Sequence, residues 1–190
     1  MKLLCATGNN HKFGIGQHTC AKFGIELEQA IFEVDEIQSE NAEEVITKKA
    51  IAKYELAKQP LLVSDDFWAI PGLKGFPGPY MKSINHWFTP KDFVNLTRKL
   101  SDRTIILQQF LAYYDGHETV VFSHDIPGVL LTDPRGNEGP PIMKVVSLEG
   151  DGGLSIAEVY DQGKAHATDR INGRKDAWYQ FAEWYSAKQN

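Results

Sequence analysis

The sequence of 190 residues is short of cysteine and has no long apolar run. Its two cysteines, Cys5 and Cys20, are too few for a disulfide framework, and their spacing is not that of a metal site. A membrane-spanning helix needs a run of about 18 apolar residues, so the sequence predicts no contact with a membrane. The apolar stretch at the start is shorter than a signal peptide requires, and we therefore expect a cytoplasmic protein.

An excess of positive charge is also absent. The 20 lysines and arginines are outnumbered by 25 aspartates and glutamates, for a net charge of −5. No basic field exists to hold a nucleic-acid polymer, so a polyanionic ligand would have to be small and bound by a few local cations or a metal ion. The histidines form no H-x-x-x-H pair, and no G-x-S-x-G motif of a serine hydrolase is present.

What remains is an ordinary globular composition in which strand and helix patterns alternate. Strands are predicted at 2–7, 25–32, 61–63, 104–114, 118–123 and 143–148. Helices are predicted at 10–23, 41–58 and 91–100, and at the C-terminus, where aromatic residues recur at helical spacing. Asp115-Gly116 predicts a hairpin between two of the strands. This order predicts an α/β fold with a mixed sheet.

The segment Thr7–Lys12 reads T-G-N-N-H-K and lies at a strand-to-helix junction. Glycine allows the backbone to approach a ligand closely, and the start of the helix presents unpaired N–H groups and a partial positive charge. With the lysine one turn into the helix, the segment could hold phosphate, although it lacks the Walker spacing. The alternative interpretation is an ordinary capped turn.

Asp65 and Asp66 directly follow the predicted strand 61–63, and Asp35 and Glu36 lie upstream. Carboxylates at a strand end that face a second acidic loop could hold a hard cation such as Mg²⁺. Because adjacent residues of a strand point to opposite faces, we expect only one aspartate of the pair to face the site. The alternative is that these are solvated loop charges.

The segment Lys164–Arg170 places two cations and several polar groups in one short stretch near the C-terminus. It could contact an anionic ligand, or it could be an exposed loop.

Taken together, these segments resemble the inosine/xanthosine triphosphate pyrophosphatase family, the Ham1-like non-canonical purine NTP pyrophosphatases. Segment 7–12 is similar to the family motif T/S-G-N-x-x-K, and residues 36–38, E-I-Q, resemble its acidic loop. Residues 63–66, V-S-D-D, and 72–80, G-L-K-G-F-P-G-P-Y, are similar to its central motif, which reads [DE]-D-[ST]-G and ends in G-x-P-G-x-Y.

The resemblance implies a single domain over residues 1–190 with an elongated mixed β-sheet flanked by helices, and two lobes with a central cleft. It implies hydrolysis of a nucleoside triphosphate to the monophosphate and pyrophosphate with Mg²⁺, or with Mn²⁺ as the alternative ion. Family members are usually homodimers. The apolar residues of segment 75–88 could simply cover the core, or part of them could join two subunits, since aromatic side chains are enriched in interfaces.

The resemblance also implies roles for individual residues. Asp65 would orient or deprotonate the attacking water and, with Glu36, bind the metal ion. Lys12 would be catalytic together with Asp65. The expected substrate-binding residues are Thr7, Gly8, Asn9, Lys12, Lys164, Thr168, Asp169 and Arg170.

Four positions depart from the family pattern. Ser64 replaces the first acid of the central motif, Ile15 replaces a glutamate, and Asp169 replaces the histidine of S-H-R. Where the family has the base-binding motif G-F-G-[WY]-D-P, this chain has P-P-I-M-K at 140–144. The departures suggest an enzyme with altered base preference, or alternatively a catalytically impaired nucleotide-binding homologue. The charges exchanged at Lys144 and Asp169 suggest an ion pair beside the base pocket; two unrelated surface charges are the other interpretation.

Overall fold

The computed structural model describes residues 2–163 and 175–188. The chain divides into two compact units. The first unit comprises Met1–Asp66, Gln109–His124 and Gly173–Asn190, and the second comprises Phe67–Gln108 and Asp125–Asn172. Three strands, β3 (Leu61–Ala69), β5 (Thr104–Tyr114) and β6 (Thr119–Leu130), have residues in both units. The single domain over residues 1–190 stays a prediction.

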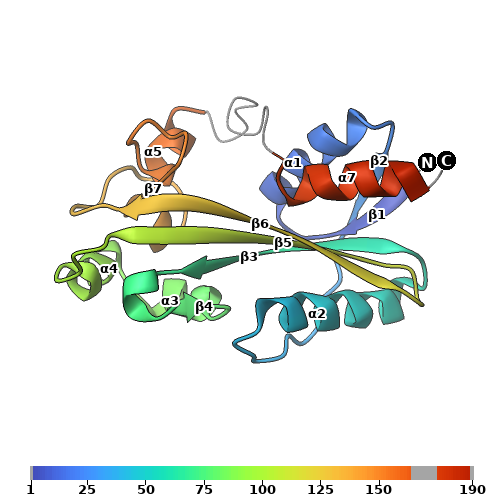
Figure 1. Cartoon of the computed structure of the whole chain (residues 1–190), viewed down its shortest axis with the longest axis horizontal. Coiled ribbons are helices and arrows are strands. Elements are labelled where there is room, and N and C mark those ends of the chain that lie inside the picture. The colour runs from blue at the N-terminus through green and yellow to red at the C-terminus, as the bar shows by residue number, and fades with distance from the viewer. Residues whose placement is uncertain (1, 164–174, 189–190) are drawn as a thin grey trace. The chain divides into compact units, whose positions relative to one another are not determined.

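The first unit contains a mixed sheet with the strand order β2-β1-β3-β5-β6 (Figure 1). Strand β1 (Lys2–Ala6) pairs in parallel with β2 (Glu26–Ala30) on one side and with β3 on the other. Because β1 lies between these two strands, its residues Leu3 to Ala6 are buried. The α/β fold with a mixed sheet flanked by helices is confirmed.

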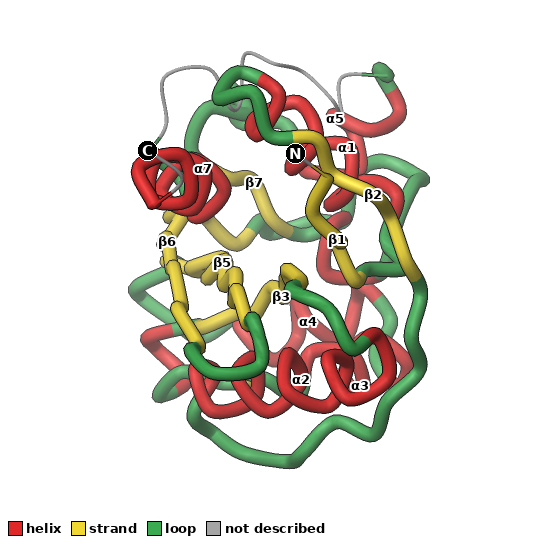
Figure 2. Tube along the Cα trace, turned by 90° about the vertical axis from the view of Figure 1, so that its right-hand side faces the viewer, coloured by secondary structure: helices red, strands yellow, loops and turns green. Residues whose placement is uncertain are grey.

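Helices cover both faces of this sheet. Helix α2 (Ala42–Ala57) lies on one face, and α1 (Asn10–Ala21) and α7 (Ala177–Lys188) lie together on the other (Figures 1 and 2). Strand β3 contributes alternately to the two cores: Leu61 and Val63 pack toward α2, and Leu62 packs toward α1 and α7. Among the described residues, no helix is long and apolar enough to cross a membrane.

Helix α1 approaches α7 closely at Gly16, which is buried. A Cβ atom at Gly16 would lie 2.6 Å from Cη2 and 2.8 Å from Cε3 of Trp178 on α7. Both distances are shorter than the van der Waals contact of two non-bonded carbon atoms, so the side chain would clash. The absence of a side chain is therefore what allows the two helices to pack.

We expect Gly16→Ala to destabilise the protein, although alanine favours helices, because the indole ring of Trp178 must move within a packed core. Overpacking of this kind costs about 1–3 kcal/mol, measurable as the free energy of unfolding in urea. The matched control is Gln17→Ala at the exposed neighbouring position, which should change it by less than about 0.5 kcal/mol. Equal stability of the two variants would contradict this packing.

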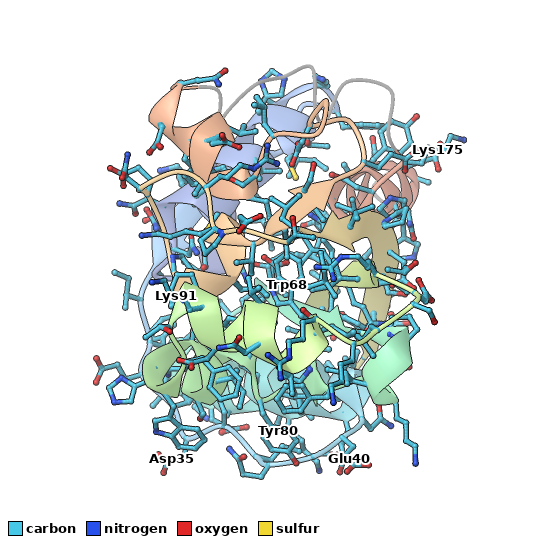
Figure 3. All side chains as sticks on the ribbon, turned by 90° about the vertical axis from the view of Figure 1, so that its left-hand side faces the viewer. Asp35, Glu40, Trp68, Tyr80, Lys91 and Lys175 are labelled. Atoms are coloured by element: carbon cyan, nitrogen blue, oxygen red, sulfur yellow. The ribbon has the colours of Figure 1, made fainter. Side chains whose placement is uncertain are left out.

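The second unit has the strand order β4-β3-β5-β6-β7, with β4 at Pro77–Gly78 and β7 at Val146–Leu148. Its helices are α3 (Met81–Trp87), α4 (Pro90–Thr97) and α5 (Ile156–Asp161), and 3₁₀ turns lie at Pro71–Leu73 and Pro141–Lys144. Trp68 of β3 belongs to its apolar core, whereas Tyr80, just before α3, is exposed. Figure 3 labels both residues.

Three predicted strand ends were wrong by three residues or more. Strand β3 does not stop at residue 63 but continues to Ala69, because Trp68 joins the core of the second unit and Phe67 is also buried. Strand β6 likewise extends to Leu130 rather than ending at 123. The strand predicted from residue 143 begins only at Val146, after a 3₁₀ turn. Helices α3 and α5 were not predicted, since each is short.

Candidate active site

The turn between β1 and α1 is held by its own polar side chains. Asn9 caps α1: its Oδ1 accepts hydrogen bonds from the backbone N–H groups of His11 (3.0 Å) and Lys12 (3.1 Å). The hydroxyl of Thr7 accepts the N–H of Asn9 at 3.2 Å. From β2, the side-chain amide of Gln29 donates to the Thr7 carbonyl oxygen at 3.1 Å. The turn is capped, as one interpretation of the sequence held, and Gly8 and Asn9 remain exposed.

Lys12 extends from the first turn of α1 to both aspartates of β3. Its Nζ lies 3.6 Å from Oδ1 of Asp65 and 3.2 Å from Oδ2 of Asp66. The two acids lie within β3, not at a strand end as predicted, because apolar residues on both sides keep the chain extended. We expected only one of the two to face the site, but the ammonium of Lys12 contacts both.

A second lysine lies on the other side of Asp65. Lys49 of α2 donates a hydrogen bond of 2.7 Å to Oδ2 of Asp65, and its Nζ also lies 2.8 Å from Oε1 of Glu36. The side chain of Lys49 is only 13% exposed. One partly buried ammonium therefore brings together the two carboxylates that the sequence predicted as metal ligands.

The two lysines keep Asp65 ionised. Burial alone would raise the pKa of Asp65, but the charges of Lys12 and Lys49, with hydrogen bonds from Lys49 and the Asp66 N–H, outweigh it. The net result is a pKa below the ordinary 3.8. Burial likewise lowers the pKa of Lys49, and Asp65 and Glu36 raise it by more, to a value above 10.5. The site is thus a series of side chains of alternating charge, which we call the charged array: Asp66, Lys12, Asp65, Lys49 and Glu36.

This array predicts how stability depends on pH. Because the pKa of Asp65 is lower in the folded protein, its ionisation stabilises the fold above pH 3.8, and this contribution is lost as pH falls through the folded pKa. We expect the free energy of unfolding of the wild type, relative to Asp65→Asn, to decrease between neutral pH and about pH 3. Urea titrations at several pH values measure it, and a constant difference would contradict the assignment.

Sequence reasoning missed Lys49. Its signal was present: Val45, Ile46 and Ala50 form the buried stripe of α2, and a lysine at position 49 falls on that stripe. A charged residue on the apolar side of an amphipathic helix needs a partner, and this one has two carboxylates.

A metal ion would fit this site only with the help of a substrate. Among the described residues, no three acidic, histidine or cysteine side chains gather into a metal site. Glu36 and Asp65, however, already place carboxylate oxygens around one cationic centre, the Nζ of Lys49. Mg²⁺ is commonly held by one or two carboxylates together with phosphate oxygens and water, so this donor set suits it.

The model of the Ham1 family matches residues 3–184. The chain belongs to the Ham1 family. A relative from Methanopyrus kandleri, named dITP/XTP pyrophosphatase, is 31% identical over 97% of this chain and 96% of its own length. One from Saccharolobus solfataricus with the same name is 29% identical over 97% of this chain and 93% of its own.

Solved structures show the same fold. The Ham1 protein of Coxiella burnetii superposes with a TM-score of 0.76 at 17% identity, covering 98% of this chain and 99% of that one. The Staphylococcus aureus Ham1 protein gives a TM-score of 0.75 at 15% identity, with 99% and 100% of the two chains covered.

Two departures from the Ham1 pattern change the chemistry of the first unit. Ile15 stands where the family pattern has a glutamate, and its apolar side chain packs against the core shared by α1 and α7. Ser64 is buried, and in the part of the chain that the structure describes its hydroxyl has no hydrogen-bond partner.

Burial raises the pKa of the thiols of Cys5 and Cys20 to about 12, so neither is a thiolate nucleophile at neutral pH.

The other predicted substrate-binding residues all belong to the C-terminal part of the sequence. Lys164, Thr168, Asp169 and Arg170 fall outside the described residues. Lys144 ends a 3₁₀ turn in the second unit. The proposed pairing of Lys144 with Asp169 therefore stays a prediction.

Proposed function

We propose that this protein is a nucleoside triphosphate pyrophosphatase that hydrolyses non-canonical NTPs or dNTPs to the monophosphate and pyrophosphate. The names of its relatives support this substrate class. The observation that carries the proposal is the charged array of the first unit, in which Lys12 and Lys49 flank an ionised Asp65.

The array suits phosphoryl chemistry, in which catalysis is mostly charge neutralisation and the positioning of a water molecule. Lys12 and the N-terminus of α1, beside the exposed turn at Gly8 and Asn9, supply positive charge for the phosphates. A bound polyphosphate competes with the carboxylates for the two ammonium groups. Asp65 is then free to accept a hydrogen bond from water and to orient it for attack, as the bond between the α- and β-phosphates breaks and pyrophosphate leaves.

Mg²⁺ is part of the proposal, with Mn²⁺ as the alternative ion. Asp65 and Glu36 would hold it together with phosphate oxygens. When bound, the ion neutralises charge on the phosphates and on the departing pyrophosphate. Lys49, which contacts both carboxylates, must be shared between them and the bound phosphates.

The test is pyrophosphate release from a panel of dITP, XTP, ITP and the four canonical triphosphates with Mg²⁺ or Mn²⁺. We expect release from one or more non-canonical substrates. Binding of these triphosphates without any release would favour the impaired nucleotide-binding homologue instead. The same panel tests the base preference: high efficiency on ITP and XTP would exclude the altered preference suggested by Lys144 and Asp169.

We also propose that the protein is a cytoplasmic homodimer. Helix α3 shows how segment 75–88 divides its apolar residues: Met81 and Ile84 are buried in the second unit, as the simpler interpretation held, whereas Trp87 is 70% exposed. An exposed tryptophan is typical of an interface core, and a twofold dimer is the commonest arrangement. Light scattering at micromolar concentration should give twice 21.4 kDa, and Trp87→Ser should shift it toward the monomer. A wild-type monomer would contradict the proposal.

A further inference from the structure

Helix α2 carries a second lysine, Lys53, one helical turn after Lys49, and this one is fully buried. Only 6% of Lys53 is exposed. Residues one turn apart lie on the same face of a helix, so Lys53 also falls on the buried stripe. Lysine is almost never fully buried without a partner, and its presence here calls for a physical reason.

The partner of Lys53 is a backbone carbonyl and not an acid. Its Nζ donates a hydrogen bond of 2.7 Å to the carbonyl oxygen of Ala6. Within residues 2–163 and 175–188, no carboxylate forms an ion pair with it. Burial lowers the pKa of Lys53 below 10.5, and the charge of Lys49 lowers it further, against opposing effects of Glu36 and Asp65. The fold keeps an ammonium where an apolar side chain would cost less.

The carbonyl that Lys53 binds is at a particular place. Ala6 is the last residue of β1 and immediately precedes the turn at Thr7–Asn9. The next carbonyl, that of Thr7, accepts the side-chain amide of Gln29 at 3.1 Å. Two consecutive carbonyls are thus fixed from different elements, one by α2 and one by β2.

These two bonds set the direction in which the turn leaves the sheet. Asn9, in this turn, caps α1 and so fixes where the helix begins. The start of the helix then determines the position from which Lys12 extends to Asp65. Phosphate sites depend on such placement, because a shift of about 1 Å in a binding group is enough to lower the rate of the reaction strongly.

We propose that Lys53 is a positioning residue for polyphosphate binding: it holds the end of β1 so that the turn Thr7–Asn9 and Lys12 meet the phosphate chain in the correct geometry. The inference rests on the proposed function for its substrate class. It assigns a role to a buried side chain that does not itself need to touch the ligand.

The experiment compares Lys53→Met, which keeps the length and apolar stem but removes the donor, with Lys48→Met, a matched control at the exposed neighbouring position on α2. Calorimetry measures the Kd of inorganic tripolyphosphate and of inorganic phosphate. We expect Lys53→Met to weaken tripolyphosphate binding by about tenfold or more, phosphate binding by less than about twofold, and Lys48→Met to change neither. In turnover, KM for the triphosphate should rise more than kcat falls.

A double-mutant cycle adds a readout that a purely structural role would not move. Gln29→Leu removes the neighbouring tie to the turn, and its effect on tripolyphosphate binding should not add to that of Lys53→Met, because both act through the same turn. Additive effects, an unchanged ratio of the two Kd values, or equal weakening of both ligands would overturn the proposal. If Lys53→Met does not fold by circular dichroism, Lys53→Gln replaces it, and failure of both to fold would show that Lys53 is structural only.

The outcomes separate this inference from the proposed function. A wild type that binds tripolyphosphate but releases pyrophosphate from no triphosphate contradicts the function and leaves the Lys53 measurement intact. A wild type that is active, with Lys53→Met binding tripolyphosphate normally, contradicts the role of Lys53 alone. A wild type that does neither contradicts both.

Discussion

Asp65→Asn should lower kcat for pyrophosphate release by about 10²–10⁴, the range expected when a general base or water-orienting carboxylate is removed. The amide has nearly the same shape, but it carries no charge and accepts a water proton poorly. Steady-state kinetics on a non-canonical triphosphate with Mg²⁺ would measure the change. At saturating Mg²⁺, KM should change much less, because Lys12 and Lys49 remain to hold the phosphates and Glu36 remains to hold the ion.

The structure also indicates that this variant folds. Each lysine that loses Asp65 keeps a second acid: Lys12 keeps Asp66, and Lys49 keeps Glu36. Neither ammonium is therefore left buried and unpaired, the situation that destabilises most. The matched control is Asp35→Asn in the exposed acidic loop, for which we expect wild-type turnover. An Asp65→Asn enzyme with wild-type kcat would remove Asp65 from the mechanism.

Lys12→Ala should weaken triphosphate binding by about 10- to 100-fold, the free energy of a hydrogen bond between charged groups converted to affinity. We propose that Lys12 contacts the β- and γ-phosphates, and the monophosphate, which lacks both, should therefore lose much less affinity. Calorimetry with a triphosphate and its monophosphate, in Ca²⁺ to slow turnover, would measure both Kd values.

Two features make this prediction specific to Lys12. Its side chain is 18% exposed and pairs with two carboxylates, so its removal leaves excess negative charge next to the bound phosphates. Lys48→Ala, on the exposed face of α2, removes the same charge without touching the site and should leave both affinities unchanged. Equal weakening of triphosphate and monophosphate by Lys12→Ala would place it away from the β- and γ-phosphates.

Local sequence patterns were sufficient for the elements that bury one clear face. Helix α2 was predicted at 41–58, and its observed bounds differ by one residue at each end. The hairpin at Asp115-Gly116 was predicted from the dipeptide and lies between β5 and β6. Patterns failed where a strand passes from one unit into the other, as β3 does after Asp66, because its second half is stabilised by a core that local sequence does not reveal.

The sequence by itself determined the family, through motifs whose order and spacing leave little room for coincidence, and it singled out Thr7–Lys12, Glu36 and Asp65 as the chemistry-bearing positions. Only the tertiary structure decided which charges meet. Residues 12, 36, 49 and 65 come from four separate segments, and an ion pair depends on distances of a few ångströms that no sequence spacing encodes. The folding of α2 against β1 and β3 brings Lys49 to Asp65 and Lys53 to the end of β1, since both lysines lie on a face that must be buried.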